Sequence, residues 1–301
     1  MFEEHYPRYD PSTDAAVAQS RTQLIPVKGR NMKTLFAVVI AVLTFSSLAS
    51  AQAWNHDPAS PIGPLHWGTV APSDATCGDS ITGEVGMKQS PIDIVPANAL
   101  MASFSAPLFK YQPTQLKIEN TGHYIEVPYD PTSYLYVGSQ PTDVYQLVQF
   151  HFHAPSEHTI NGVRYDAELH LVHTNAIGET AVVGVLLSSS AAGLPIFDTI
   201  IANSPTWPGE IELHQEVNAF DLLPFRRGFY RYAGSLTTPA CSESVQWFVL
   251  QDPVPITPGA VAKLHSLISL FPNYGGYANN NRPITNQHGR TVLKSINVPW
   301  H

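Results

Sequence analysis

The sequence predicts a mainly β protein, a single domain around a large sheet in which antiparallel strand pairs dominate, with a few short peripheral helices. Short runs rich in β-branched and aromatic residues alternate with turn residues over most of the chain. Proline and glycine are abundant, with 26 and 19 copies, and only 13% of the residues are charged. No repeat, charge block or long linker follows Trp54, which favours one domain.

The first 51 residues are excluded from this fold. The stretch MKTLFAVVIAVLTFSSLASAQA, residues 32–53, has a basic residue, an apolar run and small residues in an A-x-A arrangement at Ala49 and Ala51. That layout is typical of a secretory signal peptide, and the apolar run is shorter than the roughly 20 residues of a membrane span. We expect translation to start at Met32, or at Met1 with an unusually long polar segment before the signal. The mature protein is then exported, periplasmic or secreted, with its domain over 52–301 and no stable membrane span.

Seven strands are expected in the domain, each ending at turn residues. In chain order they cover residues 115–120, 123–129, 134–138, 144–153, 167–174, 180–187 and 244–251. One helix is expected over 257–271, with Thr257 as N-cap and Pro258 in the first position. The apolar residues that follow lie along one face of this helix. The chain after Arg282 is expected to be a short tail.

Charge and cysteine content limit the partners and the compartment. A net charge of −8 disfavours nucleic acid and anionic membranes, both of which select for basic patches. A small neutral or anionic metabolite remains compatible with it. The two cysteines, Cys77 and Cys241, both follow the cleavage site, and two thiols in an exported chain usually pair. The alternative is two unrelated buried thiols.

Three histidines and a glutamate fall within ten residues, QFHFHAPSEH, at 149–158. In a strand, alternate side chains share a face, so Gln149, His151 and His153 point one way while the intervening aromatic residues point the other. An isolated H-x-H is ordinarily a pair of histidines on an exposed strand. A metal site therefore needs a further ligand from elsewhere in the chain.

A second strand supplies that ligand, His170, with Glu168 on the same face. Between the two strands lies Asn161-Gly162, a strong hairpin signal, and a register centred there sets His153 opposite His170. Pro155 interrupts the first strand, so the ladder between them need not be continuous.

Three neutral imidazoles with a fourth position left to water are typical of a catalytic zinc site. No nearby cysteine, methionine or carboxylate favours copper or iron. We therefore expect one zinc per chain, bound by His151, His153 and His170. Gln149 and Glu168 each precede a ligand by two residues on its face, where they can accept that ligand's other N–H.

Two further histidines are interpreted differently. His158 follows Glu157 outside the strand alternation, and His173 points away from the ligand face. Both are expected to be hydrogen-bonded core residues rather than ligands.

Several segments resemble the α-class carbonic anhydrases, in particular their exported, bacterial-type members. The matching segments occur in family order and span nearly the whole chain after Trp54. They are QSPIDI (89–94), NTGHYIEV (120–127), QFHFH with SEHT (149–159), AELHLVH (167–173), YAGSLTTPACSESVQW (232–247) and NNRP (280–283). The resemblance implies a sheet of about ten strands with zinc at the base of a conical cleft, and reversible hydration of carbon dioxide to bicarbonate and a proton.

The resemblance also implies roles for single residues. His151, His153 and His170 look like the zinc ligands, and the backbone of Asn280 joins Gln149 and Glu168 as their outer hydrogen-bond acceptors. Thr237 resembles the threonine that accepts a hydrogen bond from zinc-bound hydroxide and donates to Glu157, and His123 resembles the proton shuttle. Thr238 is expected to contact bicarbonate, and the apolar wall for carbon dioxide is expected from Val172, Val182, Leu236 and Trp247. Cys77 and Cys241 match a disulfide of exported members.

The chain departs from the family pattern in places. Ala154 replaces a common tryptophan, and Asn55-His56 replaces the usual Gly-Tyr. Thr121 and Glu126 replace amide residues that commonly hold the water chain of the cleft. A carboxylate near an imidazole favours its charged form, so Glu126 also bears on His123. These departures therefore affect the expected path of the proton more than any other part of the chemistry.

Two other functions are alternatives to be tested against the same residues. One is a catalytically silent, zinc-binding relative used for recognition, which is expected to have lost a ligand or the Thr237–Glu157 pair. The other is a metallo-esterase, whose activity can coexist with hydration. The oligomeric state is left open, with a homodimer as one possibility.

Overall fold

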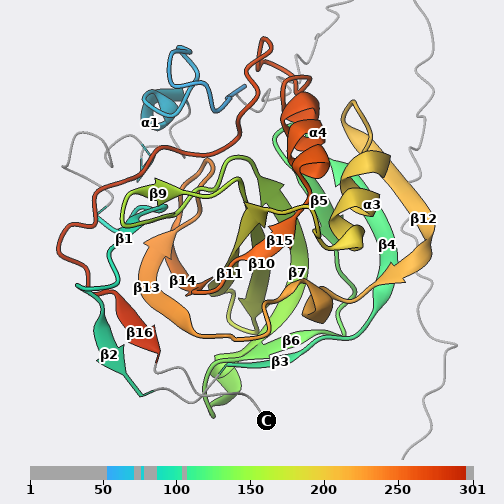
Figure 1. The fold of residues 1–301 in the computed structure, drawn as a ribbon. Helices are drawn as coiled ribbons and strands as arrows, with labels where there is room; N and C mark the ends of the chain where they lie inside the picture. Colours follow the sequence, from blue (N-terminus) through green and yellow to red (C-terminus); the bar gives the residue numbers. More distant parts are fainter. Residues whose placement is uncertain (1–52, 71–75, 78–86, 104–106, 296–301) are drawn as a thin grey trace, which may run out of the picture. The chain divides into compact units, whose positions relative to one another are not determined.

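A twisted, mixed sheet of 13 strands forms the centre of the described chain, which comprises residues 53–70, 76–77, 87–103 and 107–295 of a computed structural model (Figure 1). The predicted signal segment lies outside these residues. The strands of the described chain are β1 (Asp93–Ile94), β2 (Leu100–Ala102), β3 (Leu108–Lys110), β4 (Thr114–Asn120), β5 (Ile125–Pro128), β6 (Tyr134–Tyr136), β7 (Val144–His153), β8 (Thr159–Ile160), β9 (Val163–Arg164), β10 (Ala167–Asn175), β11 (Thr180–Ser189), β12 (Gly209–Val217), β13 (Phe229–Ser235), β14 (Glu243–Leu250), β15 (Val254–Ile256) and β16 (Leu293–Ser295).

The large sheet runs in the order β12-β4-β5-β7-β10-β11-β14-β13-β16-β2, with β3, β6 and β15 attached beside it. Most of its pairs are antiparallel, but β11 pairs in parallel with β14 and β15, and β16 with β2. The expectation of a mostly antiparallel sheet is therefore confirmed, with a parallel component that was not predicted. A smaller sheet joins β1, β8 and β9.

Within the described residues, helices are few and short, as predicted. They are α1 (Trp67–Val70), α3 (Pro195–Asn203), α4 (Pro258–Ile268) and the 3-10 turns η2 (Pro141–Asp143) and η3 (Ala219–Leu222). Helix α4 begins where its cap signal places it, since the Thr257 hydroxyl accepts a hydrogen bond from Ala260 N at 3.0 Å. Helix α3 lies beside α4 (Figure 1) and is joined to it by a hydrogen bond between Thr257 and Asp198.

Alternation along the central strands sorts their side chains into two apolar clusters. On β11, Val183 and Val185 join a large cluster that includes apolar residues of α3 and α4, whereas Val182 and Leu186 join a second cluster around Trp247. Both faces of β11 are thus buried, which explains its continuous apolar sequence. The helices cover the side of the sheet that faces away from His151, His153 and His170.

The register of the two histidine strands differs from the prediction. The hairpin forms at Asn161-Gly162, with Ile160 opposite Val163 as expected, but His170 lies opposite His151 rather than His153. The chain takes six positions from His153 to Thr159 but only four from Arg164 to Glu168. Pro155, which has no N–H to give to the ladder, lies in the longer connection. Because side chains alternate with a period of two, this displacement by two positions leaves all three histidines on one face.

The chain beyond Arg282 is not a tail, contrary to expectation. Thr285 donates its hydroxyl to Gln89 O at 2.9 Å, and Arg290 donates to the same carbonyl at 2.7 Å. Strand β16 then pairs with β13 and β2 at the end of the sheet. The segment has few apolar residues in alternation, so its pairing depends on contacts that are distant in sequence.

Candidate metal centre and active site

The three predicted ligands converge at the middle of the sheet. His151 and His153 come from β7 and His170 from the neighbouring β10, and all three are buried. The Nε2 atoms of His151 and His153 are 3.0 Å apart, and one nitrogen of each ring lies within 4.8 Å of the others. Three imidazole nitrogens therefore face one point.

The other nitrogen of each ring is held by a hydrogen-bond acceptor. His151 Nδ1 lies 2.9 Å from Gln149 Oε1, His153 Nδ1 lies 2.7 Å from the carbonyl of Asn280, and His170 Nε2 lies 3.0 Å from Glu168 Oε1. Each of these acceptors binds an N–H, so the inward nitrogen of each neutral ring carries its lone pair.

Burial lowers the pKa of all three rings, and for His153 it does so to about 4. Neighbouring imidazoles disfavour the charged form further. The rings are therefore neutral at neutral pH, which is the form that binds a metal. Three neutral nitrogen donors with their tautomers fixed fit a zinc ion better than a hard, oxygen-preferring cation.

Glu168 also binds His158, and together with His170 these residues form a second group of possible metal ligands. Hydrogen bonds within the protein already occupy the polar atoms of Glu168 and His158. Glu168 Oε1 accepts from His158 Nδ1 at 2.7 Å, and Oε2 accepts the backbone N–H groups of Glu157 and His158 at 2.9 and 2.8 Å. Burial alone raises the pKa of Glu168, but His158 and His170 outweigh it and hold that pKa well below its usual range. The other nitrogen of His158 lies 2.6 Å from the hydroxyl of Tyr232, so His158 is a hydrogen-bonded core residue as predicted.

His173 is a core residue as well. Its Nε2 lies 2.7 Å from the hydroxyl of Tyr111 on the other face of the sheet, and its Nδ1 lies 3.2 Å from the carbonyl of Ala181. Burial lowers its pKa to about 3, so the ring is neutral. Both nitrogens are occupied by protein groups.

Glu157 lies beside the three histidines and is fully buried. Its Oε1 accepts the backbone N–H of Arg282 at 2.7 Å, and its Oε2 lies 3.6 Å from His153 Nε2. Burial raises the pKa of Glu157 to about 7, against the opposing effects of His170, the Arg282 N–H and the hydroxyl of Thr237. The predicted partner residues Thr237 and Glu157 are thus brought together.

A cavity of about 220 Å³ opens over the histidines. All five residues predicted to contact substrate line it, together with two of the three ligands. The lining consists of Tyr124, Gln149, His151, His170, Val172, Val182, Leu236, Thr237, Thr238 and Trp247. Its apolar wall is suited to a small apolar molecule.

Tyr124 is the lining residue that was not predicted. Its ring centroid lies 4.5 Å from that of His151, and burial raises the pKa of its hydroxyl to about 12. No local pattern marks Tyr124 as a lining residue: it precedes Glu126 by two positions along the chain, and the pairing of Glu126 with His151 is set by the sheet register.

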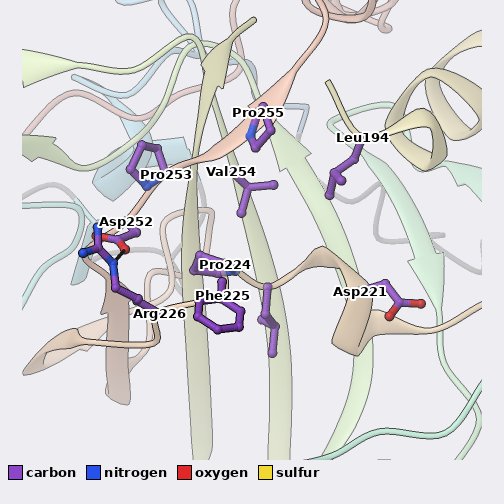
Figure 2. A pocket seen from close by; sticks show the side chains of 10 residues that line it. Leu194, Asp221, Pro224, Phe225, Arg226, Asp252, Pro253, Val254 and Pro255 are labelled. Atoms are coloured by element: carbon purple, nitrogen blue, oxygen red, sulfur yellow. Dashed lines mark hydrogen bonds and ion pairs between the residues drawn. The ribbon is translucent and has the colours of Figure 1, made fainter. Parts of the chain in front are cut away.

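A larger cavity of about 430 Å³ lies elsewhere, between Leu194, β15 and the segment around Phe225 (Figure 2). No histidine lines it, and its charged groups include an ion pair at 2.7 Å between Arg226 and Asp252. Size alone therefore does not identify the chemical site.

The ring of His123 is stacked on Trp54, with centroids 3.6 Å apart and planes within 5°. Burial lowers the pKa of His123 to about 4. Thr121 accepts the backbone N–H groups of His123 and Tyr124 at 3.3 and 3.1 Å, so this departure from the family pattern shapes the turn that presents His123.

Cys77 and Cys241 form a disulfide, which rules out two unrelated thiols. Both are fully buried. Cys241 N donates to the carbonyl of Thr238 at 2.7 Å, and Gln89 donates to the carbonyl of Cys241 at 3.1 Å. The disulfide thus anchors the loop that carries Thr237 and Thr238.

The fold and the site define a class of protein in which a twisted β-sheet carries a three-histidine metal site beneath an apolar cavity. The model of the eukaryotic-type carbonic anhydrase family matches residues 63–296. A carbonic anhydrase of Nostoc sp. is 34% identical over 281 residues, covering 92% of this chain and 98% of the relative. The chain belongs to the α-class, or eukaryotic-type, carbonic anhydrases and is an enzyme of that family.

Solved structures agree with this assignment. The α-carbonic anhydrase from Thermovibrio ammonificans, in complex with the inhibitor sulfanilamide, has a TM-score of 0.72 and 34% identity, covering 81% of this chain and 99% of that one. Dioscorin complexed with ascorbate has a TM-score of 0.70 and 28% identity, covering 82% and 100%. Bacterial relatives and the disulfide support export. No helix in the described part of the chain is long and apolar enough to cross a membrane.

Proposed function

We propose that the protein catalyses the zinc-dependent, reversible hydration of carbon dioxide to bicarbonate and a proton. One observation carries the proposal: three neutral imidazoles, each fixed by an outer acceptor, converge at a cavity with an apolar wall. When bound by His151, His153 and His170, zinc supplies the Lewis acidity that lowers the pKa of a coordinated water to about 7, so that hydroxide is available at neutral pH. One zinc per chain is proposed.

The residues around the cavity divide the remaining work. Thr237 donates its hydroxyl hydrogen to the Glu157 carboxylate, which leaves the threonine oxygen to accept a hydrogen bond from the attacking oxygen. That arrangement directs a lone pair of the nucleophile towards the substrate. Carbon dioxide is apolar and lies against the wall formed by Val172, Val182, Leu236 and Trp247. Thr238, on the same loop as Thr237, contacts the bicarbonate product.

His123 is proposed as the proton carrier between the site and the solvent. Its ring is only partly buried, and its Nδ1 has no hydrogen-bond partner among the described residues. In the stacked position its pKa of about 4 keeps the ring neutral at pH 7, so it is ready to accept a proton but binds one weakly there. Carriage of the proton is therefore proposed to involve movement of the ring away from Trp54 towards solvent.

Two other functions are less well supported. A catalytically silent zinc-binding module is expected to lack a ligand or the Thr237–Glu157 pair, and here all five residues are present together. Dioscorin, a protein that is not named a carbonic anhydrase, has a similar fold. An esterase activity of the same site can accompany hydration. Relative rates on carbon dioxide and an aryl ester separate the two enzymatic functions.

We further propose that the catalytic domain spans 52–301 and follows a signal over 32–51, and that the mature protein is periplasmic or secreted.

The test is zinc analysis together with a carbon dioxide hydration assay on the protein beginning at Gln52. We expect one zinc per chain and hydration that is lost on chelation and restored by added zinc. A stoichiometrically zinc-loaded protein without hydration activity would favour the silent module instead.

A further inference from the structure

His56 is a buried histidine in a position where the family pattern has tyrosine. Its ring is fully buried between Trp54 and Trp67, with centroid distances of 5.2 and 5.3 Å and nearly perpendicular planes. Its Nδ1 lies 2.5 Å from the hydroxyl of Tyr274. The ring also approaches the metal centre, since its centroid is 6.4 Å from that of His153.

The contact with Tyr274 fixes the tautomer of His56. The Tyr274 hydroxyl is buried, and within the described chain its hydrogen-bond partner is His56 Nδ1. A buried phenol hydrogen needs an acceptor, so Tyr274 donates and Nδ1 accepts. Burial lowers the pKa of His56 well below its usual value, which keeps the ring neutral. Its single N–H is therefore at Nε2.

That Nε2–H and an oxygen of Glu157 are both buried without a partner. Nε2 of His56 and Oε2 of Glu157 make no hydrogen bond of good geometry with any described residue. A ring nitrogen of His56, one of His153 and a carboxylate oxygen of Glu157 lie within 4.8 Å of one another. Two buried side chains that approach this closely, and whose unpaired atoms make no direct hydrogen bond, can be joined by one bridging water, and buried water typically joins such groups.

We propose that His56 is a positioning residue whose Nε2–H, through one buried water, supplies a hydrogen bond to Glu157 Oε2. This inference rests on the proposed role of Glu157. Arg282 N already fixes Oε1, and a hydrogen bond at Oε2 adds to the interaction with the Thr237 hydroxyl in holding the plane of the carboxylate. Tyr274, His56, the water and Glu157 thus form a chain that keeps the carboxylate turned towards Thr237.

A matched pair of variants tests the chain. His56→Gln keeps both functions of the ring, because the amide oxygen accepts from Tyr274 and the amide nitrogen donates to the water. His56→Leu has a similar size and keeps neither. We expect kcat for hydration to fall about tenfold in His56→Leu, with KM within about twofold, and to stay within about threefold of wild type in His56→Gln. His66→Leu, at an exposed histidine, is the control for a change of this kind elsewhere.

The same pair separates positioning from proton carriage, because glutamine cannot titrate. If His56→Gln lost as much activity as His56→Leu, the ring itself or its proton would be needed and the proposal would be overturned. Full activity of His56→Leu would overturn it as well.

Two readouts on the wild-type protein do not depend on activity, and a variant of Tyr274 extends the first of them. Nitrogen-15 NMR of the zinc-loaded wild-type protein should show His56 as the neutral Nε2–H tautomer, and Tyr274→Phe should release a fraction with the proton at Nδ1. A high-resolution crystal structure should show a water within hydrogen-bond distance of both His56 Nε2 and Glu157 Oε2. A protonated Nδ1 in wild type, or no such water, contradicts the proposal. An inactive wild-type enzyme that shows both features would instead count against the proposed function.

Discussion

At the scale of single residues, the proposed metal site depends on three rings that burial keeps neutral and that outer acceptors keep aimed. The acceptors come from two kinds of structure: Gln149 and Glu168 lie on strands beside their own ligands, and the Asn280 carbonyl lies in a loop far along the chain. Removing one ring therefore leaves two donors whose orientation is unchanged but whose number is too small for tight zinc binding.

Replacing His170 with Ala should abolish stoichiometric zinc binding. We expect wild type to retain about one zinc per chain after dialysis against a weak chelator, and His170→Ala to retain almost none. His214→Ala, an exposed histidine on β12, is the matched control and should keep its zinc. Full occupancy in His170→Ala would show that this ring is not a ligand.

Glu126 offers a prediction about pH and stability. It lies opposite both Glu119 and His151 in the sheet, and burial, followed by repulsion from Glu119, raises its pKa from 4.5 to about 7. A carboxyl group whose folded-state pKa is raised destabilises the fold once the unfolded chain ionises. The contribution of Glu126 to stability is therefore fully present below pH 4.5 and is lost as the pH rises from there through about 7.

Glu126→Gln should consequently stabilise the protein at about pH 8, by on the order of 1 kcal/mol because the side chain is only partly buried, and should change little at about pH 4. Chemical denaturation at the two pH values measures this. Glu216→Gln, an exposed position on β12, should show no such difference. Equal effects of Glu126→Gln at both values would mean that the carboxyl is not perturbed.

His123→Ala tests the proton carrier. Because attack on carbon dioxide does not need the carrier, zinc content and interconversion of carbon dioxide and bicarbonate at chemical equilibrium should be nearly unchanged. Turnover in dilute buffer should fall several-fold, and imidazole should restore much of it. Identical turnover of wild type and variant across buffer concentrations would assign proton transfer to another route.

At the scale of elements, the helices depend on caps and on each other. The Thr257 hydroxyl accepts from Ala260 N at the start of α4 and donates to Asp198 in α3, so one oxygen caps one helix and joins it to the next. The apolar residues of both helices cover the large cluster behind the histidine strands. Loss of this oxygen should therefore lower the stability of the helices that pack on the sheet, without a direct effect on the histidine site.

Thr257→Ala should lower the free energy of unfolding by about 1–2 kcal/mol, while Thr257→Ser, which keeps the oxygen, should lose much less. Denaturant titration followed by tryptophan fluorescence measures both. A serine variant as unstable as the alanine variant would mean that the threonine methyl, not the oxygen, provides the stabilisation.

At the scale of the whole molecule, the disulfide joins residues 164 positions apart and closes most of the domain into one loop. The chain-entropy model gives a stabilisation of about 5 kcal/mol for a loop of this length, and measured values are commonly lower. The double variant Cys77→Ala, Cys241→Ala should therefore unfold at lower denaturant concentration. Adding reductant should lower the midpoint of wild type and leave that of the variant unchanged. A midpoint equal to that of wild type in the variant would show that the crosslink adds no stability.

The sequence by itself determined the pattern within each strand and therefore much of the site. Alternation placed His151 and His153 on one face of β7 and His170 on the matching face of β10, and the cap signal located α4. The family segments carried the fold class and the pairing of the cysteines. These properties are local in sequence, or depend on the alternation of side chains along a strand. A shift of the strand register by two positions does not change which face a side chain is on.

Only the tertiary structure decided what depends on distant partners. The register of β7 against β10 follows from the longer connection containing Pro155, and β16 forms because β13 and β2 lie on either side of it. Tyr124, in the turn before β5, lines the cavity. The carbonyl that accepts from His153 belongs to Asn280, 127 positions away in the sequence. No local pattern encodes such contacts, because a buried polar group needs a partner in space and the fold determines which one is within reach.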